Sequence, residues 1–402
     1  MNDPIVIVAA ARTPMGGFNG ELKDFSAAQL GGFAIRAAVE RAGLAGGQAE
    51  RIDEVLMGNC LLAGQGQAPA RQASIAAGLP KSVGAVTLSK MCGSGMKAIM
   101  LAHDMLAAGS AEIMVAGGME SMSNAPYLLP RARQGYRMGH QTVLDHMFCD
   151  GLEDAYTRDA QGGGRLMGTF AEECASAFEF TRKQQDDFAI ASLTRAQAAN
   201  REGWFAWETT PIALRAGKDQ RFVEMDEQPF KANLDKIPTL KPVFKKDGGT
   251  VTAANSSSLS DGAAALVLMR QATATKLGCA PLARIVAQAT FAQEPNLFPT
   301  APVGALRRLF DRTGWASDQV DLYEINEAFA VVTMAAMREH KLRHERVNIH
   351  GGACALGHPI GASGARIVVT LIGALRRTGG KRGVATLCIG GGEATALGIE
   401  LP

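Results

Sequence analysis

Two stretches of the chain carry the same order of residues, and this repeat constrains the fold more than any other feature. Each stretch begins with Ser-Gly, a small or apolar residue and a basic residue, continues as a helical segment, and ends in a glycine stop, a short apolar strand and a glycine cluster. The first begins at Ser94 and the second at Ser363. A repeated order of this kind indicates two halves of like topology. We therefore expect two similar halves that face each other.

Short apolar strands alternate with helical segments on both sides of a less regular middle region. Alternation of this kind predicts an α/β fold in which a mostly parallel sheet is covered by helices. Strands are expected at 5–11, 55–57, 85–88, 113–116, 263–269, 321–325 and 384–389, and helices at 27–42, 68–77, 94–108, 305–313, 327–338 and 361–377. The strand at 113–116 is expected to end at Gly117.

Residues 122–253 interrupt this pattern with a mixture of Met, Pro, Tyr, Arg and Gly that has no clean period. A helical pair is expected within them at 168–178 and 182–202, with Thr181 and Gln184 at capping-box spacing. Aromatic residues further along indicate that the region packs against the rest of the chain, although a disordered insert is the alternative. The expected units are an N-terminal half (1–121 plus 254–275), an inserted loop domain (122–253) and a C-terminal half (276–402).

Composition excludes several classes of function. The 402 residues have a formal net charge of +2, so nothing favours binding to nucleic acid or to a membrane surface. No apolar run approaches the roughly 18 residues of a membrane helix, and the first residues do not fit a signal peptide. The seven cysteines form no C-x-x-C pair, which predicts reduced thiols. Only Cys354 and His358 have ligand-like spacing, so we expect no metal site. We also expect no bound cofactor. Because neither a signal peptide nor a membrane helix is indicated, we expect a soluble cytoplasmic protein.

Cys92 is the strongest candidate nucleophile. It lies where the strand at 85–88 passes into the helix at 94–108. The positive end of a helix dipole lowers the pKa of a thiol, and nearby glycines leave backbone N–H groups free to face an oxyanion. The alternative is a packed, unreactive thiol, because free cysteine is among the most buried residue types.

Three further polar residues stand at strand ends or in glycine-rich loops. His358 follows a run of glycines and precedes Pro359, which predicts a rigid loop that aims the imidazole. Cys388 ends a buried strand just before three glycines, a position where sites on parallel sheets tend to lie. Asn326 stands at a strand–helix junction. Their alternatives are a surface histidine, a core thiol and a helix N-cap, respectively.

These stretches resemble the signatures of the thiolase family. The resemblance runs through the whole chain in order, and it covers residues 91–96, 326–330, 351–364 and 388–392, with further fits at 9–14, 117–122 and 261–264. It implies two similar α/β halves in a five-layered αβαβα arrangement. It also implies that the inserted loop domain covers the coenzyme A (CoA) site and helps to form a homotetramer.

The resemblance assigns a reaction and a role to each candidate. It implies an acyl-CoA C-acyltransferase that forms or cleaves the carbon–carbon bond of a 3-ketoacyl-CoA. Cys92 would carry the acyl group as a thioester, His358 would be its general base, and Cys388 would move the proton at the α-carbon. One oxyanion hole would use His358 with a water held by Asn326. The other would use the backbone N–H groups of Cys92 and Gly390.

The resemblance also implies a binding site for CoA and the acyl group. Its residues would be Leu166, Met167, Phe244, Ser257, Phe298, Ala328 and Phe329. Leu166 and Phe298 depart from the short-chain biosynthetic branch, which typically has His and Met at these positions near the acyl end. His350 stands in place of a usual Asn, and Glu393-Ala394 in place of an apolar residue and Gly. None of these departures removes a catalytic group.

Acetoacetyl-CoA is the expected substrate, and a degradative 3-ketoacyl-CoA thiolase of broader chain length is the alternative. A non-catalytic acyl-CoA-binding protein on the same fold is less favoured, because Cys92, Asn326, His358 and Cys388 are all present. A Cys-His hydrolase would leave Cys388 and its glycines unexplained.

Overall fold

The computed structural model describes residues 3–158, 163–216 and 219–402. A ten-stranded sheet runs through the molecule in the order β14-β15-β16-β13-β1-β12-β5-β3-β4, and β2 pairs with β12. Its strands are β1 (Ile5–Arg12), β2 (Gly16–Gly17), β3 (Glu54–Gly58), β4 (Gly84–Leu88), β5 (Ile113–Ser121), β12 (Ser260–Arg270), β13 (Ala283–Ala292), β14 (Leu322–Ile325), β15 (Arg382–Ile389) and β16 (Glu393–Glu400). The two halves of the sheet meet at β1 and β13, which pair only at Val6–Arg284 and Ile7–Ala283.

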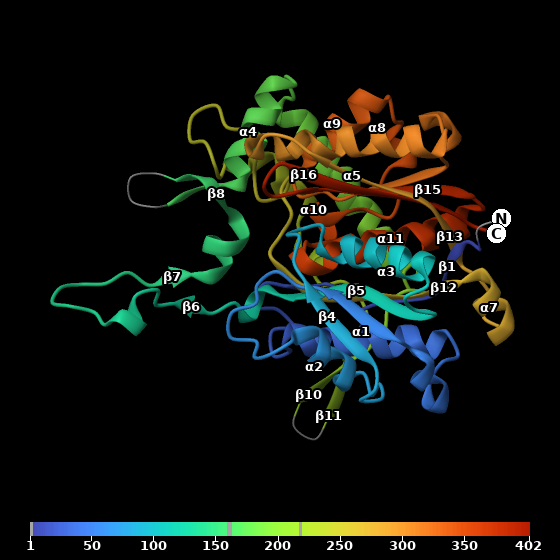
Figure 1. Ribbon diagram of the computed structural model, residues 1–402. Helices are drawn as coiled ribbons and strands as arrows, with labels where there is room; N and C mark the ends of the chain where they lie inside the picture. Colours follow the sequence, from blue (N-terminus) through green and yellow to red (C-terminus); the bar gives the residue numbers. More distant parts are fainter. Residues whose placement is uncertain (1–2, 159–162, 217–218) are drawn as a thin grey trace.

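Helices form three layers that alternate with the two halves of the sheet (Figure 1). The outer layer on the N-terminal half holds α1 (Ala27–Arg41) and α2 (Pro69–Ala76), and the middle layer holds α3 (Ser94–Ala108) and α11 (Ile360–Thr378). The outer layer on the C-terminal half holds α8 (Ala301–Thr313) and α9 (Ala330–His340). This arrangement confirms the α/β fold with αβαβα layers.

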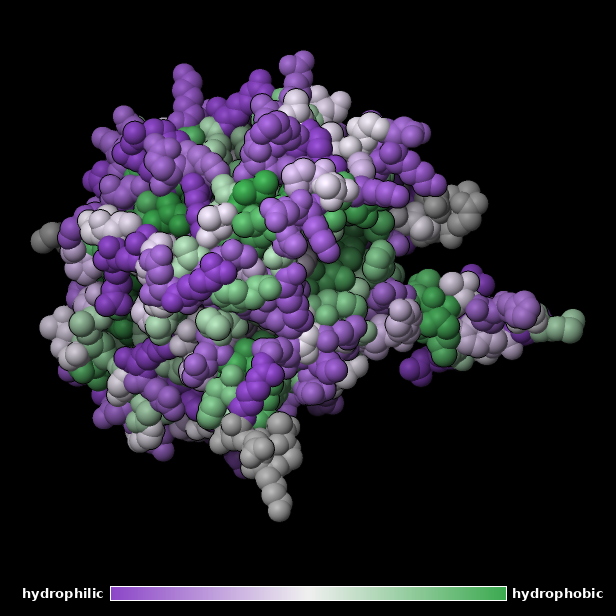
Figure 2. Space-filling view, turned by 180° about the vertical axis from the view of Figure 1, so that it is seen from behind, coloured by the Kyte–Doolittle hydropathy of each residue, from purple (hydrophilic) through white to green (hydrophobic). Residues whose placement is uncertain are grey.

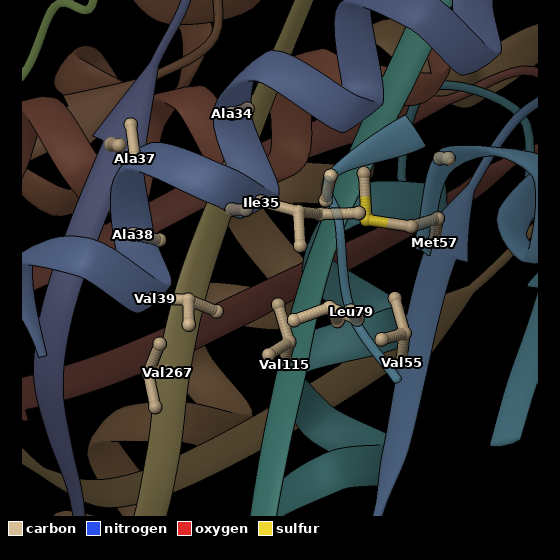
Figure 3. Close-up of a cluster of buried hydrophobic side chains, with 14 of the residues drawn as sticks. Ala34, Ile35, Ala37, Ala38, Val39, Val55, Met57, Leu79, Val115 and Val267 are labelled. Carbon is tan, nitrogen blue, oxygen red and sulfur yellow. The ribbon is translucent and has the colours of Figure 1, made fainter. Parts of the chain in front are cut away.

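The outer N-terminal core shows how the layers hold together (Figure 3). Ile35 and Val39 of α1 point toward Val115 of β5, and Val55 and Met57 of β3 complete the same cluster. All five side chains are buried. Each contributes roughly 1.5–3 kcal/mol through burial, which makes these contacts the main force that fixes α1 on the sheet.

The two Ser-Gly motifs of the repeat face each other in the middle layer. A Cβ atom on Gly95 of α3 would lie 2.8 Å from the backbone nitrogen of Ala365 in α11. A Cβ on Gly364 of α11 would in turn collide with the backbone of Met96 in α3. Only glycine permits this approach. The repeated motif therefore marks the point where the central helices of the two halves cross, as the expectation of facing halves requires.

The prediction of a mostly parallel sheet is wrong, because the sheet is mixed. The strand pairs β3–β4, β3–β5 and β14–β15 are parallel, whereas β1, β12, β13 and β16 pair antiparallel with all their neighbours. Only three residues, 390–392, separate β15 from β16. A parallel pair needs a crossover of a dozen or more residues, so this connection allows only a hairpin.

Several element boundaries also differ from prediction, and contacts with neighbouring segments explain two of these differences. β5 continues through Gly117 and Gly118 to Ser121, because the glycines do not end the strand but admit a neighbouring backbone. A Cβ on Gly118 would meet the Gly361 carbonyl at the start of α11. The helix predicted at 327–338 begins only at Ala330, since residues 328–330 are tied to the loop that contains Ser257.

The middle region carries two longer helices, α4 (Met167–Ala177) and α5 (Arg182–Arg201), and the predicted capping box of Thr181 and Gln184 is present. Its other elements are β6 (Tyr127–Leu128), β7 (Leu144–Asp145), β8 (Glu153–Arg158), β9 (Gly164–Leu166), β10 (Ile212–Ala216), β11 (Asp219–Val223) and α6 (Gln228–Lys231). The remaining α-helices among the described residues are α7 (Gln271–Leu277) and α10 (Ala353–Leu356). The arm that contains β6 and β7 projects from the body (Figures 1 and 2). The division of the chain at residues 122, 254 and 276 stays a prediction.

Within the described residues, no helix combines the length and the apolar character that crossing a membrane requires.

Candidate active site

Cys92 lies in a tight turn between β4 and α3. Ser94 closes this turn, because its hydroxyl donates to the Met91 carbonyl at 2.7 Å and accepts from the backbone N–H of Lys90 at 2.8 Å. Met91 has a φ angle of +46°, in the left-handed region that residues other than glycine rarely adopt. Strain of this kind is common at functional sites. The turn holds Cys92 at the head of α3, where the sequence predicted it.

The Cys92 thiol is neutral at rest. Burial raises its pKa to about 11, although the backbone N–H groups of Gly390 and of Cys92 itself act in the opposite direction. The expectation of a lowered thiol pKa at the helix end is therefore wrong in its net direction, because burial raises the pKa by more than the nearby backbone N–H groups lower it. A neutral thiol needs a base nearby before it can attack.

His358 has the geometry of such a base. Its Nδ1 lies 2.6 Å from the Ser363 hydroxyl, which donates to the Pro359 carbonyl at 3.0 Å. Because a hydroxyl has only one hydrogen, Ser363 accepts from Nδ1–H, and the lone pair of the ring is left on Nε2. No described residue lies within hydrogen-bonding distance of that atom. Burial, together with the positive charge of Arg366, lowers the pKa of His358 to about 3, so the imidazole is neutral.

Cys388 lies at the end of β15, next to the glycine turn. Gly391 and Gly392 have φ angles of +94° and +86°, which suit glycine alone. Gly93, the residue after the nucleophile, packs so closely on Ile389 that a Cβ there would collide with the isoleucine side chain. The segments that carry Cys92 and Cys388 are thereby brought together from opposite halves of the chain. Burial raises the pKa of the Cys388 thiol well above its ordinary value.

Asn326 is fully buried just after β14 and does not line the cavity described below. Its backbone N–H donates to the Thr386 carbonyl at 3.0 Å, so it stands beside the strand that carries Cys388. Its Oδ1 faces Arg366 Nη2 at 3.5 Å, and its Nδ2 has no partner among the described residues. The alternative that Asn326 caps a helix fails, because Phe329 is the N-cap of α9.

A cavity of ≈ 480 Å³ opens at these side chains. The predicted site residues on its wall are Cys92, Leu166, Met167, Phe244, Ser257, Phe298, Ala328, Phe329, His358, Cys388 and Gly390. Asn326 is thus the only predicted site residue that lies behind the wall. Most of the lining is apolar, which suits a ligand with a thin apolar arm that ends at the two thiols.

Comparison with known families decides which family this site belongs to. The family model described as the N-terminal domain of thiolase matches residues 5–272, and the model of the C-terminal domain of thiolase matches residues 279–401. The chain belongs to the thiolase family. This thiolase is an enzyme that transfers acyl groups.

Relatives of this thiolase match it along its whole length. Acetyl-CoA acetyltransferase 2 of Arabidopsis thaliana is 48% identical over 399 residues, which cover 99% of this chain and 97% of that protein. The acetyl-CoA acetyltransferase of Cupriavidus necator is 47% identical over 398 residues, which cover 98% of this chain and 99% of that protein.

Two crystal structures share the fold of this thiolase. A thiolase from Ascaris suum in complex with coenzyme A has a TM-score of 0.91 at 40% identity, over 99% of this chain and 100% of that one. The Bacillus anthracis acetyl-CoA acetyltransferase has a TM-score of 0.94 at 39% identity, over 100% of both chains.

Aromatic side chains form one end of the thiolase cavity. Phe298 stands edge-on to Phe170, with ring centroids 6.2 Å apart, and tilted against Phe329 at 6.4 Å. Phe329 also meets Phe244 edge-on at 6.1 Å. Leu166 and Met167 enter the wall from the start of α4. The backbone N–H of Ser257 donates to the Ala328 carbonyl at 3.0 Å, which explains why these two distant residues share the wall.

The remaining departures from the family pattern lie outside the cavity wall. His350 is buried, accepts from Arg377 Nε at 2.8 Å and packs against the Trp204 ring. Glu393 pairs with Lys90, two residues before the nucleophile, and so joins the turn at Cys92 to the one after Cys388. This ion pair is partly exposed and contributes at most about 1 kcal/mol.

Three residues that contact the predicted site were not predicted to belong to it: Glu120, Ser363 and Arg366. Glu120 accepts from the backbone N–H of Cys60 at 3.0 Å and of Gly361 at 2.9 Å, which ties the loop after β3 to the start of α11. Burial raises the pKa of this carboxyl to about 7. The available signal was a charged residue within an apolar strand, because a buried charge is rare without partners.

Within the described residues, no group of three or more His, Cys, Asp and Glu side chains is placed to hold a metal ion.

Proposed function

We propose that this thiolase forms and cleaves acetoacetyl-CoA through an acetyl group carried on Cys92. The observation that carries the proposal is the convergence of Cys92, His358, Cys388 and the Gly390 backbone on one apolar cavity. Relatives named acetyl-CoA acetyltransferase, at 47–48% identity over nearly the whole chain, support acetyl as the group transferred. Coenzyme A and acyl-CoA are then substrates, and the reaction needs no separate cofactor.

Acyl transfer begins from a neutral Cys92–His358 pair. As the thiol attacks the thioester carbonyl, its proton passes to Nε2 of His358, and this proton then goes to the departing CoA sulfur. The products are acetyl-Cys92 and free CoA. The backbone N–H groups of Cys92 and Gly390, which lie within reach of the Cys92 sulfur, are suited to hold the oxyanion that forms on the acetyl carbon.

Carbon–carbon bond formation uses the second thiol. The Cys388 thiol first gives its proton to Nε2 of His358, and the Cys388 thiolate then takes a proton from the α-carbon of a second acetyl-CoA. The resulting carbanion attacks the acetyl carbonyl on Cys92, and the Cys92 thiolate that is released takes the proton from His358. Acetoacetyl-CoA leaves, and the Cys92 sulfur is restored as a thiol. His358 Nε2, once protonated, and a water held by Asn326 Nδ2 would carry the charge on the thioester oxygen during this step. Cleavage runs through the same steps in reverse, with CoA as the entering thiol.

The aromatic end wall supports a short acyl group. Phe298 fills this end, and it is only 3% exposed. The neighbouring residues Leu297 and Pro299 of the same short turn line a second cavity of ≈ 450 Å³. That observation keeps the degradative alternative open, because a longer acyl chain would have room if the Phe298 ring moved aside.

A homotetramer is part of the proposal, and the projecting arm supports it. Tyr127, Met138 and Val143 on this arm have exposed fractions of 70%, 103% and 52%. Figure 2 shows the arm standing out from the body, with one group of hydrophobic residues partway along it among mostly hydrophilic ones. Apolar side chains gathered on a projection favour contact with another subunit. Sedimentation analysis should give four times the 42.2 kDa chain. A cytoplasmic location stays a prediction from the sequence.

The deciding experiment measures CoA-dependent cleavage of 3-ketoacyl-CoA substrates from C4 upward, with Cys92→Ala as the control. Turnover confined to C4 supports the acetoacetyl-CoA assignment. Efficient turnover of longer chains would move the enzyme to the degradative class. If wild type and Cys92→Ala are equally inactive, the proposed function is wrong, and a protein that only binds acyl-CoA becomes the better interpretation.

A further inference from the structure

Arg366 is a buried cation directly behind the active site. Its side chain is only 1% exposed and lies on α11, between the central helices and the C-terminal half of the sheet. Nη1 lies 3.3 Å from a carboxylate oxygen of Glu324, and Nη2 lies 3.5 Å from Oδ1 of Asn326. One guanidinium therefore contacts both polar residues at the end of β14. The mechanism above leaves this residue without a role.

The contact with Arg366 determines which way the Asn326 amide faces. A guanidinium has donors only, so the oxygen of the amide has to face it and the NH₂ group has to point away. The Nδ2 atom is buried and has no partner among the described residues. A buried donor without a partner costs about 1–3 kcal/mol, so its orientation needs something to enforce it. Arg366 supplies that constraint.

The face of α11 that carries Arg366 also carries Ser363. Residues three apart lie on one side of a helix, so the two side chains point the same way. Ser363 fixes the ring of His358, as described above, and Arg366 faces Asn326. His358 and Asn326, which would hold the thioester oxygen, are therefore each oriented by a side chain from the same turn of α11.

An ion pair with Glu324 does not by itself explain Arg366. Burying two charges costs about as much as their attraction returns, so apolar residues would stabilise the fold at least as well. Glu324 is 2% exposed, and burial raises the pKa of its carboxyl to about 8. The polar pair is costly, which favours a role beyond stability.

We propose that Arg366 is a positioning residue that fixes the Asn326 amide with its NH₂ group toward the reacting thioester oxygen. This inference rests on the proposed function, since it assigns Asn326 to the carbon–carbon step. Acyl transfer to Cys92 uses the other donors, the backbone N–H groups of Cys92 and Gly390. Loss of the Arg366 guanidinium should therefore impair the carbon–carbon step and leave acyl transfer to Cys92 intact.

Arg366→Lys keeps the positive charge and removes the planar guanidinium group. In this variant, acyl transfer and the carbon–carbon step are measured separately. Exchange of acetyl between acetyl-CoA and labelled CoA reports acyl transfer at Cys92, and cleavage of acetoacetyl-CoA reports the carbon–carbon step. We expect exchange within about threefold of wild type. We expect kcat for cleavage to fall about 10–100-fold with KM within about twofold, less than the 10²–10³ typical of deleting an oxyanion donor.

A double-mutant cycle then asks whether Arg366 acts through Asn326. In an Asn326→Ala background, Arg366→Lys should cause no further loss of cleavage, because its target is gone. Arg377→Lys makes the same change at an exposed position of the same helix and should leave both rates unchanged. If Arg366→Lys does not fold, Arg366→Met combined with Glu324→Met removes both charges and allows the same two measurements.

Three results would overturn the inference: unchanged cleavage in Arg366→Lys, an equal fall of exchange and cleavage, or additive losses in the double variant. Failure of the proposed function looks different, because wild type itself would then not cleave acetoacetyl-CoA.

Discussion

The Nδ1 atom of His358 lies 2.6 Å from the Oγ atom of Ser363, and the same hydroxyl donates to the Pro359 carbonyl. This chain of two hydrogen bonds sets the tautomer of the imidazole and leaves the lone pair on Nε2. In the proposed mechanism, the imidazole that serves Cys92 as a base is therefore oriented by a residue five positions further along the chain.

Replacing Ser363 by Ala should weaken the control of the His358 tautomer and ring orientation, while His358 itself remains in place. The ring could then adopt either tautomer and a wider range of orientations, so we expect kcat to fall about tenfold, a fraction of the 10²–10⁴ that a positioned base supplies. KM should stay within about twofold. Steady-state cleavage of acetoacetyl-CoA measures both. Ser74→Ala is the matched control, because Ser74 is also a buried helical serine but lies in α2. A Ser363→Ala enzyme as active as Ser74→Ala would contradict the role.

The candidate catalytic residues that line the cavity could be selected from the sequence because each has a local signature, and their catalytic roles stay a proposal. Cys92 stands between a strand and a helix, His358 between glycines and a proline, and Cys388 before three glycines. Arg366 has no such signature, since its partner is brought close only by folding. Ser363 lies five residues from His358 and begins the repeated Ser-Gly motif, but that motif does not indicate a contact with the imidazole. Arg366 reaches Asn326 across 40 positions of sequence. Local sequence patterns thus indicate the candidate reacting residues. Contacts between residues distant in the sequence, such as Arg366 and Asn326, determine how those residues are held.

The direction of the sheet strands and the pKa of Cys92 escaped prediction for the same physical reason. Both depend on neighbours that the local sequence does not name. β12 pairs antiparallel with β1 and β5, although more than a hundred residues separate β5 from β12. Burial of Cys92 comes from the assembled cavity and outweighs the helix end, which is the part visible in the sequence.

Cys388→Ala should still accept an acetyl group on Cys92 and should fail to make or cleave the carbon–carbon bond. The reason is that acyl transfer does not use the Cys388 side chain, whereas the α-proton has lost its acceptor. Intact-mass analysis after incubation with acetyl-CoA should show one added acetyl group, absent in Cys92→Ala. Cleavage of acetoacetyl-CoA should fall at least about 10²-fold.

Cys174→Ala provides the matched control for that loss. Cys174 is another buried thiol in the same cluster of side chains as Cys388 but is not on the catalytic wall. We expect it to cleave acetoacetyl-CoA within about twofold of wild type. Normal cleavage by Cys388→Ala, or an acetyl group trapped on any other residue, would remove Cys388 or Cys92 from its role.

Phe298→Met should shift the substrate preference toward longer acyl chains, although Met at this position is typical of the short-chain branch and the family pattern alone would predict the opposite. The Phe298 ring closes the acyl end of the cavity against Phe170, and a flexible methionine can move aside toward the second cavity. We expect the ratio of kcat/KM for C6 over C4 to rise about tenfold, since one or two extra methylenes in an apolar pocket are worth about 1–3 kcal/mol. Phe291→Met lies on the second cavity only and is the control. An unchanged ratio would show that Phe298 does not limit chain length.

His350→Asn should make the enzyme less sensitive to acid. Burial, together with the charges of Arg377 and Arg12, lowers the pKa of His350 to about 3 in the folded protein. The unfolded chain binds a proton near pH 6.5 that the folded protein does not bind, so stability is lost as pH falls below that value. Between pH 8 and pH 5 this loss is about 2 kcal/mol, and it disappears in the variant.

Denaturant unfolding at pH 8 and pH 5 measures the difference. His358 and the raised-pKa carboxyls of Glu120 and Glu324 titrate in both proteins, so their contributions cancel when the two are compared. As pH falls from 8 to 5, the free energy of unfolding of wild type should decrease by about 2 kcal/mol more than that of His350→Asn. If the two proteins instead lose stability in parallel, His350 is already protonated in the folded state, and its contact with Arg377 cannot be the one described.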